Sequence, residues 1–444
     1  MLETLRNAFK VKEIRSRLLF TLVALVIVRL GCQLPVPGVD STYFTQWFEQ
    51  QSALNFFDAM TGGSFTQMSI FALNITPYIT SSIIMQLLTI AIPKLEEMQK
   101  DGEDGRKKIA EYTRYVTVLL ALIEAVAMVI GFGNQGLLQG GVNLTNVCVV
   151  VTSLVAGSAF LMWIGERITV KGLGNGISIV LLINIVSRMP EDFMRLYTQF
   201  IKEATTVNKL LAAAVIAVVV IGMVVFIILL SDGERRIPVQ YAKKMQGRRM
   251  VGGQATHIPL KVNTAGVIPI IFAGSLMSFP VVIGSFMNVK PASGAGASVA
   301  EIFLKFCSQN SWCNIKSLSE FKFTLGLVVY IAMIVFFAYF YTSITFNPIE
   351  IANNMKKQGG FIPGIRPGKP TTDYLTKVLN YVIFIGAVAL SIIAFVPIFF
   401  SGVFGADVSF GGTSIIIVVG VVLETLKQVE SMMLVRHYKG FLND

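Results

Sequence analysis

Polar side chains interrupt an apolar stretch of membrane-spanning length at residues 70–92. They are Asn74, Thr76, Thr80, Ser81, Ser82 and Gln86, together with the helix-breaking Pro77. Lipid offers no partner for such groups, so a span that carries them must face protein or water. The preceding stretch, 56–69, is amphipathic, is broken by Gly62 and Gly63, and is too short to cross a bilayer. We therefore expect residues 56–93 to line and block a water-filled passage.

Residues suited to covalent chemistry are scarce. The chain has two histidines, His257 and His437, which are too few for a His-rich metal site. Residues 364–370 superficially resemble a phosphate-binding loop, but the spacing fails and Pro370 stands where Ser or Thr is required. The sequence therefore predicts neither an enzyme nor a bound metal or cofactor.

The elements that position the polar residues are predicted to be membrane helices. Mean hydropathy is +0.67, and hydrophobic residues outnumber charged ones by 54% to 14%, which excludes an ordinary soluble protein. Apolar runs recur at 18–34, 70–92, 113–132, 146–165, 174–189, 209–230, 265–287, 323–343, 374–400 and 412–428. A span needs about 20 such residues. The sequence therefore predicts an all-α integral membrane protein with about ten spans, the first of them retained.

Basic residues are concentrated in alternate loops. The formal net charge is +11. Lys and Arg cluster at 1–17, 94–112, 231–262 and 343–373, whereas 35–69, 133–145 and 401–411 contain none. Cytoplasmic loops carry the excess of Lys and Arg in membrane proteins. We therefore expect both termini in the cytoplasm.

Two of the basic loops, 231–264 and 343–373, are large enough to project from the membrane. The run 235–244 predicts a short β-ribbon, and the Gly and Pro pairs of 359–368 predict a tip with Arg366 near its apex. The basic residues of these loops either serve only to orient the protein in the membrane or form a docking face for an acidic partner. We favour docking. The expected docking residues are Arg235, Arg236, Lys243, Lys244, Arg248, Arg249, Lys356, Lys357 and Arg366.

Two cysteines fall in a loop on the other side of the predicted membrane. Cys307 and Cys313 flank Trp312. Two interpretations are open: a disulfide that closes a small outer loop, or a pair of reduced loop cysteines.

Several motifs occur in the order typical of one family. The second predicted span contains PYITSSIIMQLL. It is followed along the chain by DGEDGRKKIAEYTRY (101–115), GERITVKGLGNGISI (165–179), NPIEIANNMKKQGGFIPGIRPG (347–368) and GGTSIIIVV (411–419). With them the whole chain resembles the SecY family of protein-translocation channels, in a bacterial form. The resemblance implies two inverted five-helix halves, 1–205 and 206–444, around an hourglass pore. It also implies a lateral gate between the second and third spans and the seventh and eighth.

The resemblance implies a channel through which unfolded, signal-bearing polypeptides cross the cytoplasmic membrane and hydrophobic segments leave sideways into lipid. The implied partners are the translocating polypeptide with its signal sequence, small SecE-type and SecG-type subunits, the SecA-type ATPase, the ribosome and membrane lipid. A motor or ribosome would supply the energy and would bind the basic loops.

A pore ring is carried over by resemblance onto six residues: Ile79, Ile83, Leu181, Ile185, Ile271 and Ile417. Residues four apart share one face of a helix, and this spacing holds for Ile79 with Ile83 and for Leu181 with Ile185. A plug near 56–69 is expected to pack under this ring through Phe56, Phe57, Met60, Phe65 and Met68, with a hinge at Gly62 and Gly63. The alternative for 56–69 is an interfacial helix on the outer surface.

Glu124 lies midway along the third predicted span, where a carboxyl group is costly. We expect it in a polar cluster at the lateral gate with Gln86 as partner; the alternative is a structural hydrogen bond elsewhere in the bundle. Arg29, near the outer end of the first span, is expected to snorkel toward the interface.

Two other classes of membrane protein are alternatives for this sequence. A secondary solute transporter with inverted repeats would place an ion or substrate site of ionisable groups at the midplane. This chain has a single clear midplane carboxylate and an apolar constriction instead, and a solute transporter leaves its large basic loops unexplained. A membrane scaffold without a pore would leave the polar face of the second span unexplained.

Overall fold

Ten long helices dominate the part of the chain that the computed structural model describes. The structure describes residues 9, 11–40, 45, 61–133, 138, 141, 143–198, 206–241, 244–246, 249–251, 255–286, 289, 298–313, 321–404 and 412–440. The long helices are α2 (Lys12–Gly31), α5 (Thr76–Ala91), α7 (Glu103–Phe132), α8 (Leu144–Lys171), α9 (Gly176–Leu196), α10 (Thr206–Asp232), α11 (Ile268–Phe286), α13 (Leu325–Thr345), α15 (Lys369–Phe404) and α16 (Gly412–Gly440). Each predicted span overlaps one of them in chain order.

By length and composition, five helices of the described chain could each cross a membrane, and a bent pair provides a sixth candidate. The pair is α5 and α6 (Pro93–Lys100), which turns by 106° after Ala91. The expected second span, 70–92, was too long at its start. Residues 70–75 form turns and α5 begins at Thr76, because Pro77 has no N–H to donate and suits the first helical turn.

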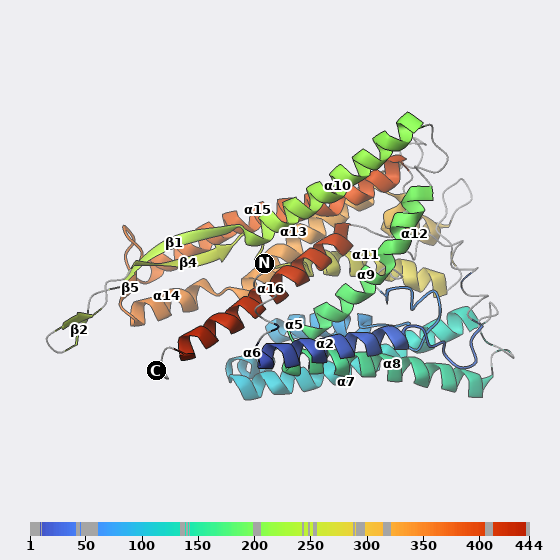
Figure 1. Cartoon of the computed structure of the whole chain (residues 1–444), viewed down its shortest axis with the longest axis horizontal. Helices are drawn as coiled ribbons and strands as arrows, with labels where there is room; N and C mark the ends of the chain where they lie inside the picture. The colour runs from blue at the N-terminus through green and yellow to red at the C-terminus, as the bar shows by residue number, and fades with distance from the viewer. Residues whose placement is uncertain are drawn as a thin grey trace.

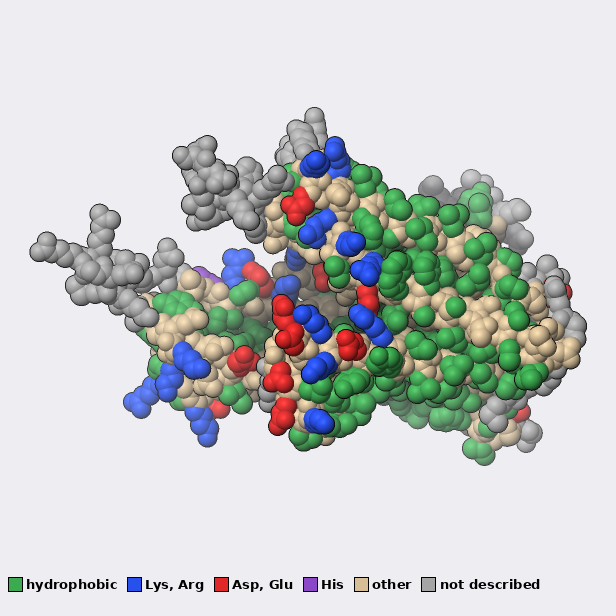
Figure 2. Space-filling model, turned by 90° about the horizontal axis from the view of Figure 1, so that it is seen from below, with side chains coloured by type: hydrophobic (Ala, Val, Ile, Leu, Met, Phe, Trp, Pro, Cys, Tyr) green, Lys and Arg blue, Asp and Glu red, His purple; other side chains and the backbone are tan. Residues whose placement is uncertain are grey.

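The helices pack in two groups (Figure 1). Helices α2, α5, α7 and α8 lie along the lower side of this view, and α10, α13 and α15 lie along the upper side. Between them, α9 packs against α16, and α7 packs against α11. Apolar side chains cover the outside of the bundle, while charged side chains gather toward one end, around a hollow (Figure 2). This distribution suits a molecule surrounded by lipid along most of its length.

A small sheet stands at that charged end, which we call the strand end. Strand β1 (Glu234–Tyr241) pairs antiparallel with β4 (Ala255–Lys261), so the predicted β-ribbon is confirmed. Strand β5 (Gly360–Phe361), from the second basic loop, adds to the other edge of β1. Ile237 and Val239 of β1 pack with Met355 of α14 (Pro348–Lys357) and with Leu375 of α15. The two basic loops therefore form one body on the end of α15.

The opposite end carries the short helix α12 (Val299–Cys307) and two 3-10 turns, η4 (Gln309–Ser311) and η5 (Phe321–Thr324). Cys307 and Cys313 are both free and buried, so the disulfide interpretation fails here and the reduced pair is what the structure contains. The turn η4 and Trp312 lie between them. The Trp312 indole is fully buried and donates a hydrogen bond of 2.8 Å to the Phe306 carbonyl, so its ring occupies the space inside this loop.

We expect mass-tag alkylation of the denatured protein to modify both Cys307 and Cys313 without any reductant. In the native protein both should react slowly, because burial excludes the reagent and raises the pKa of each thiol. Exposed Cys148 is the internal control and should react first in detergent. Peptide mass spectrometry checks the assignment. A cross-linked peptide pair that separates only after reduction would contradict it.

Candidate functional site

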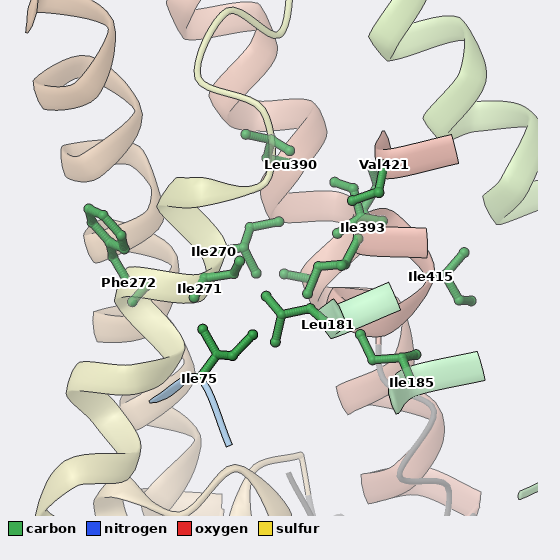
Figure 3. Packing of buried hydrophobic residues seen from close by; sticks show 14 of the residues in the cluster. Ile75, Leu181, Ile185, Ile270, Ile271, Phe272, Leu390, Ile393, Ile415 and Val421 are labelled. Carbon is green, nitrogen blue, oxygen red and sulfur yellow. The ribbon is translucent and has the colours of Figure 1, made fainter. Parts of the chain in front are cut away.

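Four helices bring the six expected ring residues into one apolar cluster. Helix α5 contributes Ile79 and Ile83, α9 contributes Leu181 and Ile185, and α11 and α16 contribute the remaining two, Ile271 and Ile417. The last four are between 2% and 8% exposed, and the two α5 residues are partly buried against the same cluster. Labelled side chains from α9, α11 and α16 take part in this cluster (Figure 3). The bundle is therefore closed at this level by branched apolar side chains.

Further residues of this cluster were not anticipated. Ile75 and Ile270 are fully buried in it, and Ile415 of α16 and Ile393 of α15 join them (Figure 3). The spacing of four residues between Ile75, Ile79 and Ile83 could have indicated that Ile75 belongs to the same face. Nothing in the sequence marked Ile393, because its neighbours come from another helix.

A polar group lies beside this apolar cluster, and we call it the asparagine node. It contains Asn74, Asn184, Arg29, Cys32 and the Gly62 backbone. Asn184 Nδ2 donates to Asn74 Oδ1 over 3.2 Å, and Arg29 Nη1 donates to the Gly62 carbonyl over 3.3 Å. The Cys32 thiol lies 4.0 Å from Asn184 Oδ1 as a weak donor. Asn184 immediately precedes Ile185, so polar and apolar groups of one helical turn meet here.

The node corrects the expectation for Arg29. Its guanidinium turns inward to a carbonyl group and does not snorkel toward the interface. Asn74 adopts a left-handed backbone conformation with φ of 51°, which Asn tolerates better than most residues. Its carbonyl accepts a hydrogen bond of 3.2 Å from Ser158 Oγ on α8. Residues from α2, α8 and α9 thus fix the segment that leads into α5.

Only part of the expected plug can be located. Phe56, Phe57 and Met60 lie outside the described residues. Gly62 and Gly63 both have positive φ, at 66° and 86°. A Cβ atom on Gly62 would lie 2.8 Å from the Asn184 carbonyl oxygen and 2.9 Å from its Cα. Hence the backbone at residue 62 rests directly on α9, where only glycine fits.

The expected positions of Phe65 and Met68 under the ring were wrong. Both are buried in a second cluster with Met128 and Phe132 of α7 and with Leu154 of α8. The reason is backbone pairing with residues 34–36: Val36 donates to the Met68 carbonyl over 3.0 Å, and Ile70 donates to the Leu34 carbonyl over 2.9 Å. These bonds turn the apolar side chains of 65–68 away from the ring.

The expected pairing of Gln86 with Glu124 was also wrong. The hydroxyl groups of Ser81 and Thr117 share a hydrogen bond, which fixes the register of the antiparallel pair α5 and α7. From this contact Gln86 lies five residues toward one end and Glu124 lies seven toward the other. At 1.5 Å per residue they are about 18 Å apart along the axis. Glu124 has no hydrogen bond or ion pair with any residue that the structure describes.

The basic residues of the strand end point outward. Arg235, Lys356, Lys357 and Arg366 are exposed, whereas Arg236 donates from Nε to Glu234 over 2.6 Å. Lys244 lies in β2 (Lys244–Gln246) and Arg249 in β3 (Arg249–Val251), which pair as a second ribbon. Lys243 and Arg248 lie outside the described residues.

Arg366 lies at a rigid tip, as its glycines predicted. Gly364 and Gly368 have φ of 83° and 105°. The Arg366 carbonyl accepts a hydrogen bond of 2.8 Å from Thr371 Oγ1. Ile365 donates from its backbone to the Ile362 carbonyl over 3.0 Å. The guanidinium is therefore presented to solvent on a fixed backbone.

The fold and its centre define a class. A lipid-facing helical bundle, closed at its centre by branched apolar residues from both groups of helices, is the architecture of a gated membrane channel. Its shape matches the structure described as a protein conducting channel, with a TM-score of 0.61 over 94% of this chain and 92% of that one, at 17% identity. It also matches Sec61 in the canine ribosome-channel complex from the endoplasmic reticulum, with a TM-score of 0.57, 16% identity and coverage of 94% and 92%.

The chain belongs to the SecY family. The family's sequence profile matches residues 69–426. The protein translocase subunit SecY of Halalkalibacterium halodurans is 41% identical over 452 aligned residues, which cover 100% of both chains.

Proposed function

We propose that this chain is the channel subunit through which unfolded, signal-bearing polypeptides cross the membrane, with lateral release of hydrophobic segments. The observation that carries the proposal is the convergence of Ile79, Ile83, Leu181, Ile185, Ile271 and Ile417 from four helices into one apolar constriction. Such a ring repels water, so ions meet a high barrier, yet it separates around a sliding peptide without binding it. Its members come from both proposed halves, 1–205 and 206–444, so a relative movement of the halves would widen it.

The contact between α7 and α11 is the proposed lateral gate. Among the described residues it is one of the two most extensive helix contacts between the proposed halves, and the other joins α9 to α16. If α9 and α16 act as the hinge side, a hydrophobic segment leaves the pore between α7 and α11. The second candidate, a solute transporter, is not favoured, because the central cluster is apolar and Glu124 has no ionisable partner among the described residues.

The strand end is the proposed docking face for the partner that supplies energy. Exposed Arg235, Lys356, Lys357 and Arg366 stand on a sheet that joins the two basic loops into one body. A positive face on a rigid support suits an acidic partner such as ribosomal RNA or an acidic motor surface. The related Sec61 channel is described in a ribosome-channel complex. A SecA-type ATPase is the other proposed partner, and SecE-type and SecG-type subunits would complete the assembly.

The proposed location is the bacterial cytoplasmic membrane. The concentration of basic residues at the strand end supports a cytoplasmic position for that end, and with it the proposed cytoplasmic position of both termini. The chain itself is proposed to have no enzymatic activity, with ATP or translation consumed by the partner.

Protease protection in proteoliposomes tests this function. The purified chain is co-reconstituted with a SecE-type subunit and is then given SecA, ATP and an unfolded signal-bearing preprotein. ATP-dependent protection of the preprotein supports the proposal. No protection with an intact complex and an active motor would overturn it, and substrate-dependent solute flux without a soluble partner would favour the transporter.

Charge reversal at the tip, Arg366→Glu, is expected to reduce the protected fraction at least about tenfold, since the loss of a charge that is buried and hydrogen-bonded in a docked complex costs about 2–5 kcal/mol. The matched control is Lys12→Glu, an exposed charge reversal at the first turn of α2, outside the sheet. Binding of SecA to the reconstituted channel should fall in parallel. Equal loss in both variants would indicate a general electrostatic effect and would contradict specific docking at Arg366.

A further inference from the structure

Helix α12 is amphipathic, and neither the constriction nor the docking face uses it. It lies at the end of the molecule opposite the strands, between α11 and α13 in the chain (Figure 1). It begins with a capping box, in which Ser298 Oγ accepts from the Glu301 backbone over 3.4 Å and Glu301 Oε2 accepts from the Ser298 backbone over 3.0 Å. Both ends of this short helix are thus fixed, because Trp312 holds the Phe306 carbonyl at the other end.

One side of α12 is fastened to the bundle. Leu304 and Cys307 are buried, and the Leu304 side chain packs over Gly284 in the last turn of α11. Trp312 lies against Tyr330 of α13, with ring centroids 5.5 Å apart. This packing fixes the rotation of α12 about its axis, so the direction of its other side chains is determined.

A second side of α12 is apolar and uncovered. Val299, Ile302 and Phe303 are 85%, 42% and 53% exposed, and their spacing places them on one face of a helix. The polar residues Glu301 and Lys305 lie on the remaining side. The Lys305 ammonium group sits 5.1 Å from the centre of the Phe323 ring, beside the start of α13. The helix therefore has a protein side, an apolar side and a polar side.

The apolar side continues a surface that faces lipid. On α11, Leu276, Phe279 and Ile283 are exposed, and Ile283 immediately precedes the glycine under Leu304. On α13, Leu325 and Val328 are exposed at the adjoining end. Since α11 and α13 present these residues to the bilayer, the uncovered face of α12 borders the same hydrocarbon. A helix with one apolar face and one charged face lies in the plane of the membrane interface.

We propose that α12 is an interfacial helix whose Val299, Ile302 and Phe303 side chains insert among the lipid acyl chains, with Glu301 and Lys305 at headgroup level. The occupant of this surface is bilayer phospholipid. Through Leu304 and Trp312 the helix couples the ends of α11 and α13 to the position of the bilayer surface.

Photolabelling of the unaltered chain tests the proposal. The protein is placed in nanodiscs that contain a phospholipid with a diazirine on its acyl chain, and adducts are mapped by peptide mass spectrometry. We expect adducts at Val299, Ile302 and Phe303, and none at Glu301. Phe279 and Ile283 of α11 serve as internal positive controls. Adducts on α11 but not on α12 would overturn the proposal.

Fluorescence quenching provides a second test with matched sites. In a Cys148→Ser background the other three cysteines are buried, so Phe303→Cys and Glu301→Cys can each be labelled selectively. We expect the probe at position 303 to be quenched by brominated acyl chains and protected from iodide, and the probe at position 301 to show the reverse. Iodide quenching at position 303 equal to that at position 301 would contradict insertion.

Discussion

Replacing Ile79, Ile83 and Ile185 together by serine is expected to raise the resting ion conductance of the channel at least about tenfold. The three side chains belong to the cluster that closes the bundle. Each change removes apolar carbons that are worth about 0.8 kcal/mol per buried CH₂. Three changes together exceed the ~1.4 kcal/mol that corresponds to a tenfold shift in an equilibrium, here that between a dry and a wet constriction. Single-channel recording in a planar bilayer measures the effect.

A matched control uses three isoleucines that face lipid. Ile123 and Ile130 of α7 and Ile221 of α10 are exposed and lie outside the central cluster. Their joint replacement by serine applies the same chemical change to the same class of helix. We expect no change in resting conductance for this control. An unaltered conductance in the ring variant, with normal assembly, would exclude these residues from the seal.

Substitution of Gly62 by alanine is expected to raise the open probability of the resting channel about tenfold. A left-handed backbone costs a non-glycine residue about 1–2 kcal/mol. The added Cβ would also lie 2.8 Å from the Asn184 carbonyl oxygen and 2.9 Å from Arg29 Nη1, closer than van der Waals contact allows. Backbone cannot yield as a flexible side chain does, so the segment at residue 62 must leave α9. Bilayer recording gives the open probability, and amide exchange over 61–69 reports the local release.

Gly63→Ala separates strain from steric contact. Gly63 also has positive φ, so alanine meets the same backbone penalty, but its Cβ would lie 3.7 Å from the nearest heavy atom, Arg188 Nη1. We therefore expect a smaller rise in open probability than for Gly62→Ala. Equal effects of the two variants would show that the contact with α9 is irrelevant to closure and that backbone strain alone acts.

In the proposed channel, the asparagine node and the ring would contribute two kinds of interaction to closure. The ring excludes water through apolar side chains, which have no directional preference and separate without leaving a polar group unsatisfied. The node holds Gly62 through the hydrogen bond from Arg29 to its carbonyl and through its close approach to the Asn184 backbone. Breaking this hydrogen bond takes from the partly buried Arg29 guanidinium its acceptor at residue 62, and an unsatisfied buried donor costs about 1–3 kcal/mol. We therefore propose that the node holds the segment at residue 62 in place until a translocating polypeptide displaces it.

Some features followed from local rules and were predictable. The ten helices arise because apolar runs of sufficient length must satisfy their backbone bonds internally in lipid. The β-ribbon at 235–241 followed from its alternating residues, and the turns around Arg366 followed from glycines that accept positive φ. The ring residues were placed by resemblance, and the helical spacing of Ile79 and Ile83 agreed with it. These properties depend on neighbours a few positions apart in the chain.

Other predictions were wrong because the contacts concerned depend on helix register and on residues far away in the chain. Residue type alone favours a pair between Gln86 and Glu124, but the Ser81–Thr117 contact sets the register of the two helices so that these two side chains lie far apart. Phe65 and Met68 were directed to the ring, but backbone bonds to residues 34–36 turn them toward α7 and α8. A shift of one helical turn or the pairing of one strand decides such contacts, and neither leaves a local signal.

By itself the sequence determined that this protein is a bundle of membrane helices with a basic end, two projecting loops and residues fit for an apolar constriction. Tertiary structure alone decided which residues meet: Ile75 and Ile393 in the closed cluster, β5 on the edge of β1, and Asn184 against Gly62. The physical reason is the distance along the chain over which each property is determined. Hydropathy, charge and backbone preference are properties of short segments, whereas contact between segments depends on how whole helices rotate and slide as they pack.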